Sequence, residues 1–118
     1  MTIQSHMRKE DVDLVFKALS DPTRRELLDQ LRDGPRTTGA FCERFEMTRF
    51  GVMKHLKALE EAKLLTVEWH GRERWNYLNA YTLQKAFERW VKPYESLWAS
   101  KLDGFKKKVE GDGNDGNE

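Results

Sequence analysis

The sequence predicts a mainly α-helical domain with one β-hairpin, in the order α-α-α-α-β-β-α, that ends in a long C-terminal helix. Three observations support this fold class. Apolar residues recur every three or four positions in the stretches assigned to helices. Two stretches, 65–69 and 74–78, instead alternate with a period of two and flank a Gly-containing turn at 70–73. Residues typical of helix starts, Asp21-Pro22 and Thr48, stand directly before helical stretches.

The composition is compatible with nucleic-acid binding. The chain has 118 residues, enough for one domain, and 35% of them are charged against 38% hydrophobic, as expected for a soluble and largely helical protein. The formal net charge of +1 averages unlike segments, because four of the 20 acidic residues fall in 109–118, where no Lys or Arg stands. The remainder carries 21 basic and 16 acidic residues, a net +5 that suits phosphate contacts.

Several classes of protein are not favoured. The single cysteine, Cys42, rules out an internal disulfide and suits a reducing cytoplasm. No apolar run approaches the roughly 18–20 residues that span a bilayer. No nucleophile–base pair, paired carboxylates or phosphate-cradling Gly-rich loop stands out. We therefore expect a cytoplasmic protein that is not an enzyme, has no cofactor and does not enter a membrane.

The first three predicted helices form the body of the domain. The first runs from about Glu10 to Leu19, with apolar residues at 3–4 spacing. Asp21 caps the second, with Pro22 at its first position, and this helix ends near residues 33–35. Thr37 or Thr38 caps a short third helix.

The fourth helix has an unusual outward face. It begins at the N-cap Thr48, and at 100° per residue Val52, Leu56 and Leu59 share one inward face. In a major groove, apolar side chains of the other face can pack on thymine methyl groups, a first-turn arginine can reach guanine, and lysines can meet phosphates. The alternative is that Phe50 and Met53 fill an intramolecular contact against the third helix. The predicted DNA-contacting residues of this helix are Thr48, Arg49, Phe50, Met53, Lys54 and Lys57.

The hairpin adds a second basic element. Arg72 and Arg74 straddle its tip, where a wing touches the DNA backbone or reaches into the minor groove. A short helix with such a face, followed at once by a β-wing, is characteristic of a winged helix-turn-helix, so residues 10–81 are predicted to bind double-stranded DNA. The alternative for the hairpin is a mixed-charge surface loop. Trp75 and Tyr77 share one face and are expected to pack on the body.

The C-terminal helix is predicted to run over residues 82–109, roughly 40 Å, with Pro93 causing a kink or a broken hydrogen bond. It carries a continuous, mainly aromatic stripe and is longer than this domain needs for its own core. We expect a homodimer in which the first and last helices pair across a two-fold axis and two recognition helices lie about 34 Å apart on a pseudo-palindromic operator. An aromatic effector pocket is the alternative. The predicted interface residues are Val12, Val15, Phe16, Phe87, Trp90, Tyr94, Leu97, Trp98, Leu102 and Phe105.

Two terminal segments complete the predicted organisation. Residues 1–9 are expected to be a flexible N-terminus. Residues 110–118 are rich in Gly, Asn and acidic side chains and are expected to form a disordered acidic tail.

Three motifs stand out along the chain: ALSDPTRR at 18–25, the pattern VxxHLxxLExAxLL at 52–65, and the wing with Gly71-Arg72. Together they resemble the ArsR/SmtB family of bacterial winged-helix repressors, and the resemblance covers residues 12–80. It implies a homodimeric repressor that binds operator DNA and is released by an inducer. The long aromatic C-terminal helix resembles a subgroup whose members often have no metal site.

The metal ligands of that family are not matched. Its thiolate site uses Cys-x-Cys at the start of the third helix, where Thr37 and Gly39 stand, and Cys42 lies one turn further on. Its other site uses Asp, His and Glu on the last helix, which here has no His. The three histidines share no ligand spacing. We expect no metal, leave a small-molecule inducer unidentified, and keep an oxidant-sensing Cys42 as an alternative to a buried structural thiol. The three histidines without ligand spacing are His6, His55 and His70.

A competing function is a winged-helix interaction module that uses the long helix to bind a protein and has weak or no specific DNA binding. Such a module would not need five cations together on one face. Those cations, which favour the repressor, are Arg49, Lys54, Lys57, Arg72 and Arg74.

Overall fold

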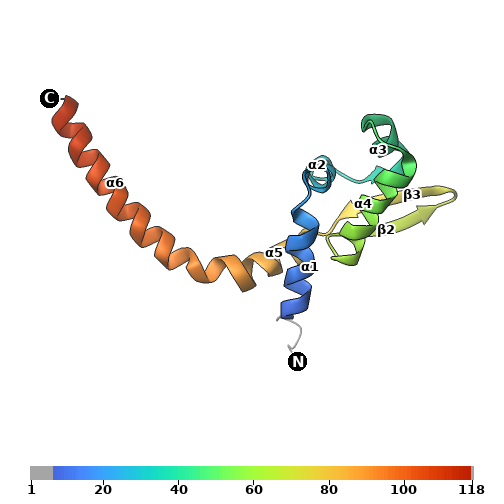
Figure 1. Cartoon of the computed structure of the whole chain (residues 1–118), viewed down its shortest axis with the longest axis horizontal. Helices are drawn as coiled ribbons and strands as arrows, with labels where there is room; N and C mark the ends of the chain where they lie inside the picture. Colours follow the sequence, from blue (N-terminus) through green and yellow to red (C-terminus); the bar gives the residue numbers. More distant parts are fainter. Residues whose placement is uncertain (1–6, 118) are drawn as a thin grey trace.

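A computed structural model describes the backbone of residues 7–117 and the side chains of residues 7–109. A small helical body carries a projecting β-hairpin on one side and a long C-terminal helix on the other (Figure 1). The body contains α1, α2, β1, α3 and α4, and the hairpin consists of β2 and β3. In chain order the elements are α1 (Lys9–Leu19), α2 (Pro22–Leu31), β1 (Arg36–Thr37), α3 (Thr38–Arg44), α4 (Arg49–Glu61), β2 (Leu65–His70), β3 (Glu73–Leu78), α5 (Ala80–Ala86), η2 (Phe87–Val91), η3 (Lys92–Tyr94) and α6 (Glu95–Asn117).

The corner between α1 and α2 is built by the segment 21–25. Asp21 Oδ1 accepts hydrogen bonds from the backbone N–H groups of Thr23 at 2.8 Å and Arg24 at 3.2 Å, and Pro22 occupies the first turn of α2. The predicted cap is therefore confirmed. The two arginines turn back and satisfy the last carbonyls of α1: Arg24 Nε donates to Ala18 O at 2.7 Å, and Arg25 Nη1 donates to the carbonyl of Leu19 at 2.7 Å. These bonds satisfy groups that a helix end otherwise leaves open.

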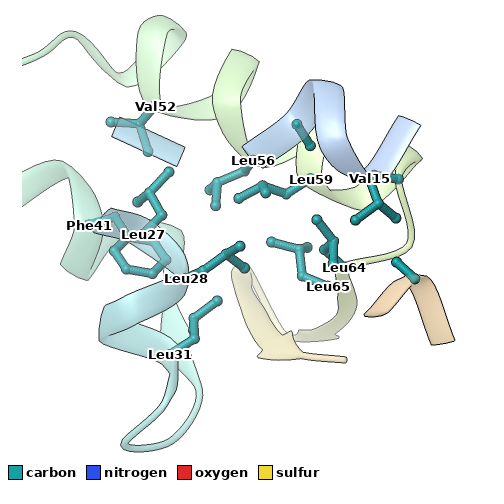
Figure 2. Close-up of a cluster of buried hydrophobic side chains, with 13 residues drawn as sticks. Val15, Leu27, Leu28, Leu31, Phe41, Val52, Leu56, Leu59, Leu64 and Leu65 are labelled. Carbon is teal, nitrogen blue, oxygen red and sulfur yellow. The ribbon is translucent and has the colours of Figure 1, made fainter. Parts of the chain in front are cut away.

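One hydrophobic core holds α1, α2, α3, α4 and the start of β2 together (Figure 2). Val15 is fully buried within it, so the prediction that Val15 lies at a dimer interface is wrong: its partners belong to its own chain. Val12 is also buried, and Phe16 is half-buried. The core consists of Val15, Ala18, Leu27, Leu28, Leu31, Phe41, Val52, Leu56, Leu59, Ala62, Leu64, Leu65 and Ala86.

The predicted hairpin is confirmed, and a third strand extends its sheet. The sheet is antiparallel with the order β1-β3-β2, and His70 pairs with Glu73 next to a turn in which Gly71 has φ of 66°. That positive φ suits glycine, which has no Cβ. Strand β1 is only two residues long, too short to show a periodic pattern, so the sequence does not predict it.

The two faces of β3 are the reverse of the expectation. Arg74 and Asn76 are buried and face the body, whereas Trp75 and Tyr77 lie on the other side of the strand and are half-buried. The Trp75 ring lies 5.9 Å from the His70 ring, and Tyr77 Oη donates to Glu68 at 3.3 Å. The prediction that the two aromatic residues pack on the body is therefore wrong, because the polar pair finds buried hydrogen-bond partners there.

The C-terminal region is not one continuous helix. Between α5 and α6 the backbone passes through a π-helical segment, η2, and a 3₁₀ segment, η3, which contains Pro93. The predicted local break at Pro93 is thus confirmed, because proline has no N–H to donate and its ring crowds the preceding turn. Helix α6 then runs away from the body (Figure 1), and the radius of gyration of 19.8 Å exceeds the roughly 13–14 Å of a compact domain of this length.

The two terminal segments differ in part from expectation. Helix α1 already begins at Lys9, and residues 1–6 lie outside the described residues. The backbone of the expected disordered tail continues α6 as a helix as far as Asn117, while side chains beyond Val109 lie outside the described residues. None of the described helices combines the length with the apolar composition that a membrane-spanning segment needs.

Candidate nucleic-acid interface

Helix α4 is held in one rotation by its cap and by its apolar face. Thr48 Oγ1 accepts a hydrogen bond from the Gly51 N–H at 3.0 Å, which confirms Thr48 as the N-cap. Val52, Leu56 and Leu59 are fully buried in the core (Figure 2). Because these three side chains share one side of the helix, the opposite side must face away from the body.

The outward side of α4 carries cations around one aromatic ring. Arg49, Lys54 and Lys57 are exposed, and Phe50 is 79% exposed. The alternative that Phe50 fills an intramolecular contact is therefore wrong. Met53 is half-buried and packs against the core, so only part of its side chain is available at the surface.

His55 belongs to the body. It is half-buried, and its Nδ1 lies 3.4 Å from Arg24 Nη1, while Nη2 of the same guanidinium donates to Lys17 O at 3.0 Å. This contact links α4 to the corner between α1 and α2. Burial acts to raise the pKa of the neighbouring Asp21 carboxyl, but the N–H donors of Arg24 and Thr23, together with the charges of His55 and Arg24, outweigh it and lower that pKa.

The wing presents one of the two predicted arginines. Arg72 is exposed in the turn beside Gly71. Arg74 is only 7% exposed: its Nη1 donates to Asn76 Oδ1 at 2.6 Å and its Nη2 donates to Glu60 Oε1 at 2.9 Å. The prediction that Arg74 contacts DNA is therefore wrong, because the guanidinium is turned into the protein and engaged there.

Trp69 is an exposed aromatic residue of the wing that the sequence-based prediction did not include among the candidate DNA contacts. It is 63% exposed and pairs with Arg74 across the hairpin, on the same side of β2 as Leu65 and Val67. Leu65 is buried and Val67 is half-buried, so exposure on this side rises toward the tip of the hairpin. The signal was the period-two alternation, which places a large apolar side chain where the hairpin extends past the body.

The described residues contain no group of three or more His, Cys, Asp or Glu side chains that could hold a metal ion. Cys42 is half-buried and packs against the core, and His70 Nε2 lies 3.1 Å from the Glu68 carboxylate on the exposed wing.

Helix α3, the turn to α4, the capped helix α4 and the β2–β3 wing define a winged helix-turn-helix protein. Residues 19–68 match the family described as a helix-turn-helix domain. The chain is 39% identical over 70 residues to the transcriptional repressor SdpR of Bacillus subtilis (strain 168), covering 59% of this chain and 78% of that protein.

Solved structures of transcriptional regulators have the same fold as this chain. An ArsR family transcriptional regulator is similar with a TM-score of 0.71 and 32% identity, over 80% of this chain and 97% of the other. An ArsR-like transcriptional regulator from Rhodococcus sp. RHA1 is similar with a TM-score of 0.66 and 27% identity, over 85% of this chain and 93% of the other. The chain belongs to the ArsR family of winged helix-turn-helix transcriptional regulators.

Proposed function

We propose that this protein is a transcriptional repressor that binds a pseudo-palindromic operator in double-stranded DNA as a homodimer. The observation that carries the proposal is the outward side of α4, where the exposed Phe50 shares the helix surface with the exposed cations Lys54 and Lys57, and Arg49 stands exposed in the first turn. An exposed phenylalanine lowers the solubility of a protein, so its presence on the surface indicates a binding partner. The DNA major groove offers methyl groups to the ring and phosphates to the neighbouring cations.

Each side chain has a role that its position supports. Arg49, in the first turn of α4, reaches base edges, and Phe50 packs on thymine methyl groups or sugars. Lys54 and Lys57 neutralise phosphates. The Thr48 oxygen already accepts the bond from Gly51, but its hydroxyl hydrogen is free to donate to a phosphate oxygen.

The wing contributes contacts beside those of α4. Arg72 meets the DNA backbone or enters the minor groove. Trp69 adds an exposed indole near the wing tip, where it can pack on a deoxyribose and donate its N–H to a phosphate. Met53 supports the α4 contacts from its half-buried position.

The dimer is proposed from the apolar surface of η2, η3 and α6. Its large side chains from Phe87 to Phe105 are between 39% and 65% exposed, and large apolar side chains gathered on one exposed segment are typical of an interaction surface. A groove beside it, between α1 and η2, is lined by Val12 and Trp90, with Lys9, Asp13 and Arg89 at its edge. A second copy of the chain would bury both. The stripe consists of Phe87, Trp90, Tyr94, Leu97, Trp98, Leu102 and Phe105.

Footprinting on the promoter of the protein's own gene tests the proposal. We expect protection of two related half-sites with centres about one helical turn apart, as a two-fold dimer requires. A Phe50→Ala, Arg49→Ala double variant serves as a matched control that should lose the protected site while still folding, because both side chains are exposed. If the wild-type protein protects no two-fold site in any genomic fragment, the interaction-module alternative is favoured.

A further inference from the structure

A buried polar network joins the recognition helix α4 to the wing. At its centre the Arg74 guanidinium donates to Glu60, near the end of α4, and to Asn76 on its own strand. Asn76 in turn donates through Nδ2 to Thr38 Oγ1 at 3.1 Å and to Arg36 O at 3.2 Å. The network therefore ties β3 to α4 on one side and to β1 and the start of α3 on the other.

The network restricts where the wing can lie. The Arg74 side chain is 6% exposed, so its charge has little water around it and depends on the Glu60 carboxylate at 2.9 Å. Asn76 is fully buried, and its amide satisfies the Thr38 hydroxyl and the Arg36 carbonyl. Moving the wing away from α4 would separate a buried cation from its partner, a displacement that the low-dielectric interior opposes.

The position of Arg74 relates this restriction to DNA binding. Arg72, the exposed arginine of the turn, is two residues away along the chain, and Trp69 is the cross-strand partner of Arg74. A small change in the orientation of β3 at Arg74 would therefore displace both Arg72 and Trp69. Glu60 lies one turn beyond Leu56 and Lys57 on α4, so the ion pair connects the two surfaces that must meet the duplex together.

We infer that Arg74, acting with Glu60, is a positioning residue for DNA binding: it sets the wing relative to α4 and does not contact DNA. The inference rests on the proposed function, since it assigns a role within DNA binding. The inference also predicts a change in operator affinity opposite to the change that net charge alone would give. Removing the acidic side chain of Glu60 should weaken operator binding, although loss of a negative charge ordinarily strengthens the attraction between a protein and DNA.

The first experiment measures operator affinity and its salt dependence for the Glu60→Ala, Glu60→Gln, Arg74→Met and Arg72→Ala variants and for the Arg72→Ala, Arg74→Met double variant. We expect Glu60→Ala and Arg74→Met each to weaken binding about tenfold, and Glu60→Gln, which keeps an acceptor oxygen, to weaken it less. The double variant should lose less affinity than the sum of the two single losses, since part of the effect of Arg74 passes through Arg72 and part through Trp69. Additive losses, with a salt slope reduced by about two, would mean that Arg74 contacts phosphate itself and would overturn the inference.

Thermal unfolding of every variant separates positioning from stability. The half-exposed Glu60 makes Glu60→Ala the informative variant if Arg74→Met does not fold. A Glu60→Ala protein that is folded at the binding temperature and keeps full affinity overturns the inference.

A second experiment reports on the wing without DNA. Spin labels at Glu73→Cys on the wing and Lys57→Cys on α4, in a Cys42→Ser background, give the distribution of distances between the two elements. We expect a narrow distribution that broadens or shifts with Glu60→Ala and stays narrow with Glu61→Ala, the neighbouring carboxylate. An unchanged distribution contradicts the positioning role. If the wild-type protein binds no operator while the distribution behaves as expected, the proposed function fails and the mechanical link between wing and α4 stands.

Discussion

The hydroxyl oxygen of Thr48 accepts a hydrogen bond from the backbone N–H of Gly51 at 3.0 Å, and this bond marks where the recognition helix α4 begins. It satisfies one of the N–H groups that the first turn of a helix leaves without a partner. Arg49 and Phe50 stand directly after the cap, so the direction in which their side chains leave the helix depends on this turn being formed.

Thr48→Ala should destabilise the protein by about 1 kcal/mol, the usual effect of removing an N-cap side chain. Thr48→Ser keeps the acceptor oxygen and should restore most of that loss. Urea denaturation followed by circular dichroism measures both free energies of unfolding. Equal stability of the Ala and Ser variants would show that the cap contributes nothing.

Phe50→Ala should leave the free energy of unfolding almost unchanged, because the ring is 79% exposed and has little to lose inside the protein. Specific operator binding should weaken by about 1.5–3 kcal/mol if the ring is fully buried against DNA. Binding to unrelated DNA should change little. Fluorescence anisotropy with operator and random duplexes makes the comparison, and a loss of stability with unchanged specific affinity would contradict the assigned role.

Arg72→Ala should weaken binding to all sequences by a similar factor and reduce the slope of log affinity against log salt by about one, as expected for one lost phosphate contact. Lys107→Ala is the matched control, because Lys107 is an exposed cation on α6 whose ion pair with Asp103, at 3.4 Å, is a surface contact. Titrations at several salt concentrations distinguish them. If both variants give the same slope of log affinity against log salt, Arg72 does not contact DNA.

Leu102→Glu should shift the protein from dimer to monomer, because it introduces a charge into the apolar stripe of α6, where Leu102 is exposed in the single chain. Ser100→Glu changes the same helix by the same charge, on the side opposite Trp98 and Leu102 at 100° per residue, and should remain dimeric. Sedimentation velocity measures the result. A dimeric Leu102→Glu protein would exclude this part of the stripe from the interface.

The Asp21 cap predicts an acid-dependent part of stability. The folded-state pKa of Asp21 is lowered, so its contribution is present above the unfolded-state pKa and is lost as pH falls through the folded value. Asp21→Asn, which still caps a helix but does not titrate, should lose less stability than the wild type between neutral pH and about pH 3. Thermal unfolding across this range tests the prediction, and parallel curves for both proteins would contradict it.

Most of the fold was predictable because local chemistry dictates it. The caps at Asp21 and Thr48 are hydrogen bonds between residues two or three positions apart, and both are present in the structure. The outward direction of Phe50 follows from helical periodicity once Val52 and Leu56 are assigned to the core. The hairpin follows from its alternation and from Gly71.

The candidate site was predictable on α4 and at Arg72 in the turn of the wing, but not in β3. In β3 the alternation correctly places Arg74 and Asn76 on one side and Trp75 and Tyr77 on the other, but it does not say which side is inward. Hydrophobicity favours the aromatic pair, and the structure buries the polar pair instead. The inward side is decided by two hydrogen bonds to distant residues: Arg74 donates to Glu60, and Asn76 donates to Thr38, which lies 38 residues before it in the chain. No local sequence pattern reveals these contacts.

The sequence by itself therefore determined the helix starts, the rotation of α4 and the presence of the wing, since each depends on neighbouring residues and on one repeating period. Only the tertiary structure decided that Val15 packs in its own core, that the segment η2 before Pro93 is π-helical, and that Arg74 lies inside. The physical reason is that burial depends on which distant groups can satisfy a side chain. A guanidinium moves inward when a carboxylate and an amide from the fold receive its hydrogen bonds.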